Sequence, residues 1–396
     1  MLPLGVAAVV LYALSQRRRP AAAAPPPAPL PAPPAALCLR PYLERLVAGA
    51  AAGALSEAEF EAIGAAIARG GVDAHQLSGF LLALAARGES SAALVGLARA
   101  MRAAAARVPL PAGAPPLQEI VGTGGDGQDT VNISTAAALL TAACGVPVAK
   151  HGSSAVSSRS GAADVLGALG GAHLPPAAIP ACLARCGLAF MHAPLFHPAM
   201  RHVAPVRRAL RVRTVFNALG PLLNPAGAQH LLLGVYSQEL LPLYAEAVAR
   251  LGVARALIVH TPLPCGGGLD ELATIGAPAR AVEVGPGGAR SECVIDSAAW
   301  GVPQGALADL RGGSPAENAA ALRALLAGGA AAAHSTLGRT VALNAGAALY
   351  CYGAAPSVQA GYGVALAALE AGRAGALLGE WARATQELAA GGGQSA

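Results

Sequence analysis

The sequence predicts an α/β fold in which a small N-terminal helical domain precedes a larger domain with a mostly parallel central sheet covered by helices. Two patterns carry this prediction. Between Pro41 and Ala106, apolar residues recur at helical spacing. From residue 114 onward, short apolar runs typical of strands alternate with helical segments flanked by glycine, as in a parallel sheet with helices on its faces. The length of 396 residues has room for both parts.

Residues 1–37 are predicted to lie outside the fold. An apolar run over 2–14 is followed by three arginines and an Ala/Pro tract, and the first acidic residue of the chain is Glu44. The run is too short for a comfortable membrane span. This composition indicates an organelle-targeting extension with a polyproline-like linker, and import into a plastid is the expected route. A signal anchor or a misassigned start codon are alternatives, and without import the protein is expected in the cytoplasm.

The helical domain is expected over residues 38–108, joined by a helical segment near 195–213. Ser56 followed by Glu59 is typical of a helix N-terminus, and Gly70-Gly71 ends that helix. The apolar positions of three helices are Leu43, Leu46 and Val47, then Phe60, Ile63 and Ile67, then Leu77, Phe80, Leu81 and Leu84. The stretch Pro109–Pro116 is predicted to be a linker.

The α/β domain is expected over residues 114–390, with a frayed tail at 391–396. Strands are predicted at 120–121, 146–149, 230–236 and 256–260, and helices at 164–169, 238–251, 316–327 and 338–350. A ligand of such a sheet binds outside the carboxyl ends of its strands. We therefore expect the functional site where the strand at 120–121 ends.

Composition narrows the function classes. The net charge is +5, but the three arginines of residues 1–37 account for part of it, and the remaining 24 basic and 22 acidic residues leave a balance of +2. A body this close to neutral is not an obvious nucleic-acid binder. Seven cysteines without a CxxC pair indicate reduced, scattered thiols and argue against a zinc site.

Lys150 is the single lysine of the chain, and all 26 other basic side chains are arginine. A compact ammonium fits a tight phosphate site that a planar guanidinium does not, which favours a functional reason for the lysine over chance. Upstream, an apolar strand runs into GTGGDG (122–127), and NIST (132–135) begins a helix. Strand, Gly-rich loop and helix N-terminus together are typical of an anion cradle. The glycine spacing matches neither a P-loop nor a dinucleotide fingerprint.

These segments resemble those of the anthranilate phosphoribosyltransferases, the second-step enzymes of tryptophan biosynthesis. The matching strings are GTGGDG, NIST, KHG with AVSSRSGAADVLGALG (150–170), HPAMRHVAPVRRALRVRTVFNALGPLLNPA (197–226), GLDE (268–271) and DLRGG (309–313). They occur in the family's order and span residues 38–385. The resemblance implies transfer of a phosphoribosyl group from phosphoribosyl pyrophosphate to the amino group of anthranilate, a magnesium ion, and a homodimer formed through the helical domain. Plant-lineage enzymes of this pathway are plastidial, which agrees with the extension.

By the same resemblance, three groups of site residues are expected. Phosphoribosyl pyrophosphate is bound by Gly122, Gly125, Asp126, Thr130, Asn132, Ser134, Thr135, Lys150, Ser157 and Ser158. Anthranilate is bound by Gly122, Ser153, His197 and Arg207, with His151 in the same channel. Magnesium is held by Ser134, Asp270 and Glu271. No acid–base catalyst is implied.

Plainer interpretations stay open for several of these residues. Asn132, Ser134 and Thr135 are also typical of helix caps, Asp270-Glu271 of a solvated acidic pair, and either histidine of a packed core residue. The other arginines of the 199–213 segment are predicted to be solvated. Ser153, Ser154 and Ala162 depart from the family's usual Asn, Arg and Ser, although plant-type members also have Ser at position 153. The loop 260–270 is longer than usual by a few residues.

Two other functions share this fold. A non-catalytic, nucleic-acid-binding paralogue is favoured by the Arg cluster at 201–213, and a pyrimidine-nucleoside phosphorylase by the fold alone. The preserved GTGGDG, NIST, Lys150 and Asp270-Glu271 argue against the first. The FNALGPLLNP string (216–225) and the GLDE pair argue against the second. We expect no nucleic acid and no membrane among the partners.

Overall fold

The computed structural model describes residues 36–49, 53–155, 159–264 and 266–391. The predicted extension lies almost entirely outside these residues, as do Ser157 and Ser158. The fold begins slightly before residue 38, because the Leu37 amide donates a 2.7 Å hydrogen bond to the Gly71 carbonyl. Within the described residues, no helix is both long and apolar enough to cross a bilayer.

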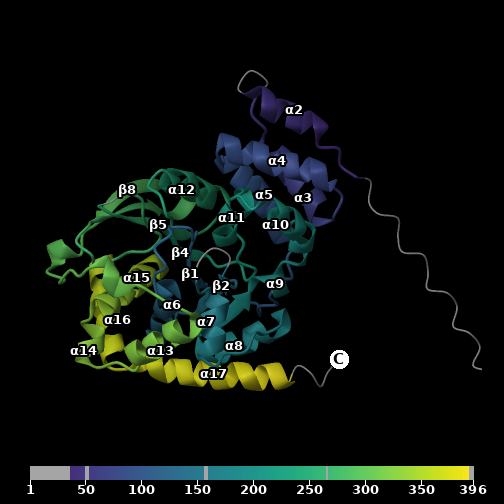
Figure 1. Ribbon diagram of the computed structural model, residues 1–396. Helices are drawn as coiled ribbons and strands as arrows, with labels where there is room; N and C mark the ends of the chain where they lie inside the picture. The colour runs from purple at the N-terminus through teal and green to yellow at the C-terminus, as the bar shows by residue number, and fades with distance from the viewer. Residues whose placement is uncertain (1–35, 50–52, 156–158, 265, 392–396) are drawn as a thin grey trace, which may run out of the picture. The chain divides into compact units, whose positions relative to one another are not determined.

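In the described residues up to Ala103, four helices form the N-terminal part: α2 (Arg40–Ala48), α3 (Glu57–Ala68), α4 (Ala74–Arg87) and α5 (Ser91–Ala103). The predicted start of α3 is confirmed, because the Ser56 hydroxyl accepts from the Glu59 amide while the Glu59 carboxylate accepts from the Ser56 amide at 2.7 Å. The predicted apolar positions of α3 and α4 are buried, so these helices pack through one shared core. Figure 1 shows the four helices together.

The predicted α/β sheet is confirmed and is mostly parallel. Its strand order is β3-β2-β1-β4-β5-β7-β8, with the two-residue β6 paired to β5. The first five strands in this order pair in parallel, and the rest are antiparallel. The strands are β1 (Gln118–Gly122), β2 (Val148–Gly152), β3 (Leu188–His192), β4 (His230–Gly234), β5 (Arg255–Pro262), β6 (Gly268–Leu269), β7 (Ala279–Val284) and β8 (Arg290–Ile295).

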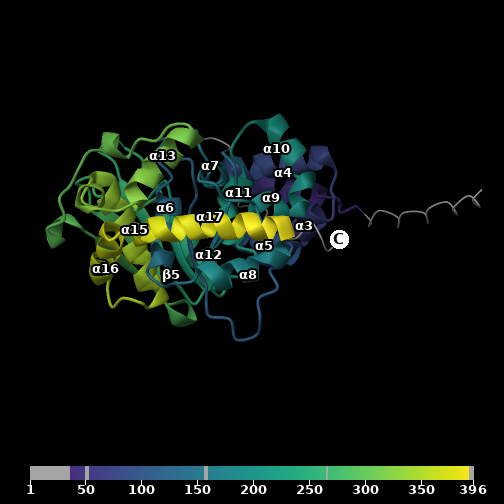
Figure 2. The same ribbon diagram turned by 90° about the horizontal axis from the view of Figure 1, so that it is seen from below.

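Each face of the sheet has its own core, as the alternation along β4 shows. Leu232 belongs to the core shared with α6 (Ile133–Ala143) and α15 (Thr336–Tyr352), whereas Leu231 and Leu233 belong to the core shared with α3–α5 and α12 (Leu240–Arg250). The N-terminal helices are thus packed onto one face of the sheet. The other face is completed by α7 (Ala162–Ala168), α8 (Ile179–Cys186), α13 (Pro315–Leu326), α14 (Ala330–Ala333), α16 (Val358–Glu370) and α17 (Arg373–Gly391). Helix α17 packs against α6 and α8 (Figure 2).

The segment 199–213 is not one helix. It consists of a 3-10 turn (Pro198–His202) and the short helix α10 (Ala204–Leu210), which ends at Arg211 with φ +54°. Pro205 explains the break, because its ring and missing N–H are incompatible with a helix running through from residue 199. Beside this segment lie the four-residue α9 (Ala193–Phe196) and α11 (Val215–Ala218). The 3-10 turn contacts α3, and α10 and α11 contact α4, which places this connection between the sheet and the N-terminal helices.

Candidate active site

A cavity of about 810 Å³ opens where β1, β2 and β3 end, between those strand ends and the segment from α9 to α11. Six of the residues predicted to bind substrate line it: Gly122, Ser134, Lys150, Ser153, His197 and Arg207. Its charged lining residues are Lys150, Arg201, Arg207 and Arg213, and none of the described residues that line it is acidic. The cavity is therefore suited to anionic ligands.

Lys150 lies on the floor of this cavity with only 3% of its surface exposed. Its ammonium donates to the Ile120 carbonyl at 2.8 Å and to the Ser134 hydroxyl at 3.3 Å. Burial lowers the Lys150 pKa to about 8, against the opposing effect of Glu119, a carboxylate that is also buried. An ammonium has three N–H donors. The protein uses two of them, and one remains for a ligand.

The Gly-rich loop is held at the carboxyl ends of β1 and β4. The Thr123 amide donates to the Gly234 carbonyl at 3.0 Å, and the Gly124 amide donates to the Asp270 carboxylate at 2.6 Å. A Cβ atom at Gly122 would lie 2.3 Å from an Asp270 carboxylate oxygen, so only glycine allows this approach. Gly125 has φ +85°, which other residues rarely adopt. The loop thus presents bare backbone toward the ligand space.

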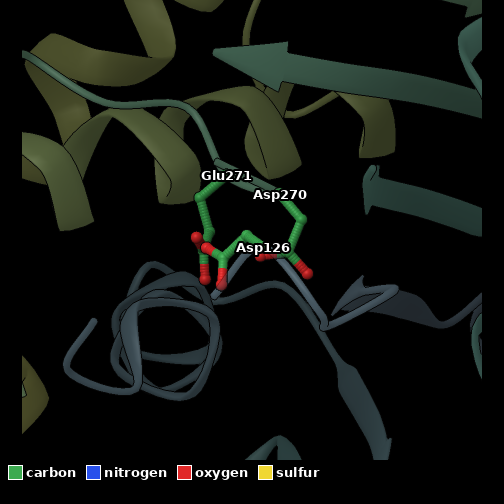
Figure 3. A group of neighbouring side chains, drawn as sticks. All are labelled: Asp126, Asp270 and Glu271. Atoms are coloured by element: carbon green, nitrogen blue, oxygen red, sulfur yellow. The ribbon is translucent and has the colours of Figure 1, made fainter. Parts of the chain in front are cut away.

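Next to this loop, three carboxylates converge. One oxygen each of Asp126, Asp270 and Glu271 lie within 4.8 Å of one another. Figure 3 shows Asp126 coming from the Gly-rich loop and the other two from the segment after β6. Asp270 is buried, so the interpretation as a solvated acidic pair is wrong. Asp126, which the resemblance placed with phosphoribosyl pyrophosphate, is also the third member of this acidic cluster.

The electrostatics of the cluster fit a hard cation. Burial raises the pKa of Asp270 to about 6, with a further contribution from Asp126, and burial together with Asp270 raises the Glu271 pKa well above its ordinary value. One carboxylate oxygen of Asp126 and one of Glu271 are buried without a hydrogen-bond partner among the described residues. Buried, mutually repelling carboxylates with unpaired oxygens are the ligands that Mg²⁺ takes.

Asn132, Thr130 and Thr135 lie outside the cavity lining. The Asn132 amide nitrogen donates to the Ser160 carbonyl at 3.0 Å, and its oxygen accepts from Asn318 at 3.0 Å. Asn132 therefore joins α6 to the loop before α7 and to helix α13, and it does not cap α6, although it occupies the N-cap position. Thr130 pairs with Arg311 in an isolated bridge, and the Thr135 hydroxyl is buried without a hydrogen-bond partner in the described part of the chain.

His151 and His197 face each other in the cavity wall, with their Nε2 atoms 3.2 Å apart. Burial lowers the pKa of His151 to about 3 and that of His197 to about 4. Both imidazoles are therefore neutral at physiological pH, and neither adds a cation to the site.

The arginines of the segment predicted as one helix divide into two groups. Arg207 is half-buried in the cavity wall, as expected for a ligand-binding residue. Arg201 and Arg213 are exposed, as predicted, but they also line the cavity, which the sequence did not indicate. Arg208 and Arg211 are exposed and lie outside the lining. The break at Pro205 and the end of α10 separate these side chains, so the arginines do not form one basic stripe.

Comparison with known proteins assigns the chain to a family. Residues 40–105 match the helical bundle domain of the glycosyl transferase family, and residues 114–375 match its a/b domain. The chain is 46% identical to the anthranilate phosphoribosyltransferase of Methylocella silvestris, over 88% of this chain and 95% of the relative. It is 45% identical to that of Rubrobacter xylanophilus, over 87% and 98%.

Solved structures agree with these relatives. The anthranilate phosphoribosyltransferase of Thermus thermophilus superposes with a TM-score of 0.78 at 43% identity, covering 87% of this chain and 99% of that one. The enzyme of Saccharomyces cerevisiae, in complex with phosphoribosyl pyrophosphate and Mg, gives 0.77 at 28% identity, covering 88% and 98%. The yeast enzyme has also been solved with 4-fluoroanthranilate.

Proposed function

This chain belongs to the anthranilate phosphoribosyltransferase family, and we propose that it transfers the 5-phosphoribosyl group from phosphoribosyl pyrophosphate to the amino group of anthranilate, in tryptophan biosynthesis. The observation that supports this best is the pairing of a cation-lined cavity with an acidic cluster beside its Gly-rich loop. Both substrates are anions, and a pyrophosphate group is commonly bound together with Mg²⁺. A site of this kind can bind the anionic substrates through its cations and the Mg²⁺ of the pyrophosphate through its carboxylates.

The chemistry needs stabilisation of charge more than a base. The amino group of anthranilate is unprotonated at neutral pH, so it attacks C1 of the ribose as the C1–oxygen bond to pyrophosphate breaks. Negative charge then grows on the leaving pyrophosphate, and positive charge on the ribosyl centre. Lys150, which lines the cavity with one N–H left for a ligand, is placed to neutralise the leaving group beside the Gly-rich loop. The neutral pair His151 and His197 adds no cation near the positive ribosyl centre.

Asp126, Asp270 and Glu271 would hold the magnesium ion, with Ser134 near Lys150 as a further oxygen ligand from the sequence prediction. When bound, the ion supplies electrostatic neutralisation of the pyrophosphate oxygens. The carboxylates orient the Gly-rich loop at the same time, through the bond from the Gly124 amide to Asp270. Thr130, Asn132, Thr135, Ser157 and Ser158 stay predicted donor-binding residues.

Turnover tests this function directly. Anthranilate fluorescence should decay when phosphoribosyl pyrophosphate and Mg²⁺ are both present, and stay constant when either is omitted. A DNA mobility-shift assay with the same preparation tests the nucleic-acid-binding alternative, and phosphorolysis of a pyrimidine nucleoside tests the other. Decay without a shift or phosphorolysis supports the transferase, and a DNA shift without decay would contradict it.

Arg207 is proposed to bind the anthranilate carboxylate, and Arg207→Ala should raise the KM for anthranilate far more than that for phosphoribosyl pyrophosphate. Losing one partner of a charge-assisted hydrogen bond costs about 1.5–3 kcal/mol, roughly ten- to a hundredfold. Ser153 and Ser154, in place of Asn and Arg, leave fewer groups to share the contact, so the upper end is expected. Exposed Arg208→Ala is the matched control. Equal increases in both KM values would contradict the assignment.

We propose a homodimer formed through the N-terminal helices. Val47 on α2 is 80% exposed and lines a shallow, largely apolar depression together with Leu43. Leu46, beside Val47 in the sequence, is buried in the core of the N-terminal helices and does not belong to this surface. Val47→Glu should convert the dimer to monomer at micromolar concentration in multi-angle light scattering, with the melting temperature unchanged. A dimer that persists would place the interface elsewhere.

Residues 1–35 are proposed to be a plastid transit peptide, on the basis of three arginines, no acidic residue and an Ala/Pro tract. Fused to a fluorescent protein, they should direct it to plastids in an algal or plant cell. An enzyme lacking them should keep its full activity in vitro, because the described fold begins after them. Cytoplasmic fluorescence would overturn the import proposal, and lost activity would show that the segment belongs to the fold.

A further inference from the structure

Arg213 is a cation of the active-site cavity that the reaction scheme above does not use. It lies in the connection between α10 and α11, and its guanidinium lies over the Tyr236 ring, 4.9 Å from the ring centroid. Among the described residues it forms no ion pair. It lines both the 810 Å³ cavity and an adjoining pocket of about 200 Å³. No carboxylate of the described chain lies within ion-pair distance of its guanidinium, although Glu89 lines the same smaller pocket.

The position of Arg213 is set by the Gly-rich loop. A Cβ atom at Gly125 would lie 1.9 Å from one of the guanidinium nitrogens, so the guanidinium occupies the place that any other side chain there would fill. Tyr236, which supports the guanidinium, is itself tied to the loop, because its amide donates to the Thr123 hydroxyl at 3.3 Å. Loop, aromatic ring and guanidinium thus form one assembly at the carboxyl ends of β1 and β4.

We propose that Arg213 is a second donor-binding cation, which contacts the pyrophosphate group that the Gly-rich loop holds. This inference rests on the proposed function. A guanidinium offers a planar pair of N–H donors that matches two phosphate oxygens, whereas the ammonium of Lys150 acts as a point charge. Lys150 is buried on the cavity floor and Arg213 is exposed at its edge. The two cations therefore reach different oxygens of the same leaving group.

Contact with the loop assigns Arg213 to the donor and not to anthranilate. Arg207 lies on α10 and has no glycine of the loop against it, whereas Arg213 lies directly against Gly125. The cation–π contact with Tyr236 holds the guanidinium in this place before any ligand arrives. Loss of Tyr236 should consequently weaken the same interaction that loss of Arg213 removes, but by less.

Pyrophosphate binding tests the proposal without turnover. Calorimetric titration of the full chain with magnesium pyrophosphate should show a Kd raised roughly ten- to a hundredfold in Arg213→Ala, partly restored in Arg213→Lys and less affected in Tyr236→Leu. The KM for phosphoribosyl pyrophosphate should rise in parallel, while that for anthranilate changes less than about twofold. Arg208→Ala, which removes an exposed arginine outside the cavity, is the control and should leave all three values unchanged.

Each contrary outcome has a distinct meaning. An unchanged Kd for pyrophosphate in Arg213→Ala overturns the proposal. Equal increases in both KM values also overturn it, because they would make Arg213 a residue that positions the loop. If wild-type protein binds pyrophosphate but never consumes anthranilate, the proposed function fails while the assignment of Arg213 to a pyrophosphate site stands. Melting temperatures within a few degrees of wild type show that the exposed substitution has not unfolded the protein.

Discussion

Replacing Asp270 by Asn together with Glu271 by Gln should abolish phosphoribosyl transfer at ordinary magnesium concentrations while leaving the fold intact. The two side chains and Asp126 supply three carboxylates within 4.8 Å, and only one negative charge would remain. Electrostatic stabilisation by a bound cation is worth several kcal/mol in a transition state, so we expect kcat/KM to fall by about a thousandfold or more. The asparagine side chain would keep an oxygen that accepts from the Gly124 amide, which preserves the loop.

The same variant should be more stable than wild type when magnesium is removed. Burial and mutual repulsion raise the pKa of Asp270 to about 6, above its ordinary value of 3.8. The folded state therefore binds more protons than the unfolded state between about pH 4 and 6, so the stability of the wild type falls as pH rises through that window. Burial also raises the Glu271 pKa well above its ordinary value, so stability continues to fall until both carboxyl groups are ionised, and Asn and Gln remove this destabilisation. Added magnesium should stabilise the wild type and not the variant.

Thermal unfolding with EDTA or with magnesium, at pH 4.5 and pH 7.5, measures the direction of each predicted change in stability. Initial rates across a magnesium titration measure the activity. Glu292→Gln, which neutralises an exposed carboxylate on β8, is the control and should change neither. Near wild-type rates at all magnesium concentrations would show that the metal is held elsewhere. A variant less stable than wild type in EDTA would show that the cluster is not strained without its ion.

Much of the fold could be predicted because each signal was local. The apolar runs of β2, β4 and β5, the Gly-rich loop after β1 and the Ser56–Glu59 capping box all lie within a few consecutive residues. Strand β8 had no such signal. It is the edge strand, paired only to β7, and five of its six residues are exposed, so its sequence Arg-Ser-Glu-Cys-Val-Ile has no apolar pattern. The 199–213 segment had a local signal that was misleading. Its residues have helical spacing, which predicted one helix, and the effect of Pro205 on that helix was given too little weight.

The sequence predicted many of the residues that form the site, but not which of them contact one another. Asp126 and Asp270 are separated by 144 residues, and only the return of the chain after β6 to the end of β1 makes them neighbours. Likewise, Asn132 has the residue type and position of a helix cap, and only tertiary contacts show that its amide joins Ser160 and Asn318. The sequence does not distinguish Arg213 from the four other arginines of its segment. Gly125, which leaves room for its guanidinium, is 88 residues away.

Lys150→Arg, which conserves charge, should raise the KM for phosphoribosyl pyrophosphate by at least about tenfold. The ammonium is almost completely buried and lies between the Ile120 carbonyl and the Ser134 hydroxyl, at 2.8 and 3.3 Å. A guanidinium is larger and planar, and overpacking of this kind costs roughly 1–3 kcal/mol. It must therefore push into the space of the ligand or displace Ser134. Burial also lowers the pKa of Lys150 to about 8, so the lysine can release its proton at moderately alkaline pH. An arginine at this position would stay charged and would bear the full cost of burial.

Lys150→Met separates shape from charge, because methionine fills a similar volume without an ammonium. We expect Lys150→Met to lose donor binding at unchanged melting temperature, and Lys150→Arg to lose donor binding and also melt several degrees lower. Arg208→Lys, an exposed exchange of the same two residue types, should alter neither quantity. If Lys150→Arg kept the wild-type KM while Lys150→Met did not, charge alone would explain the site. The presence of one lysine among 26 arginines would then have no explanation in the shape of the cavity floor.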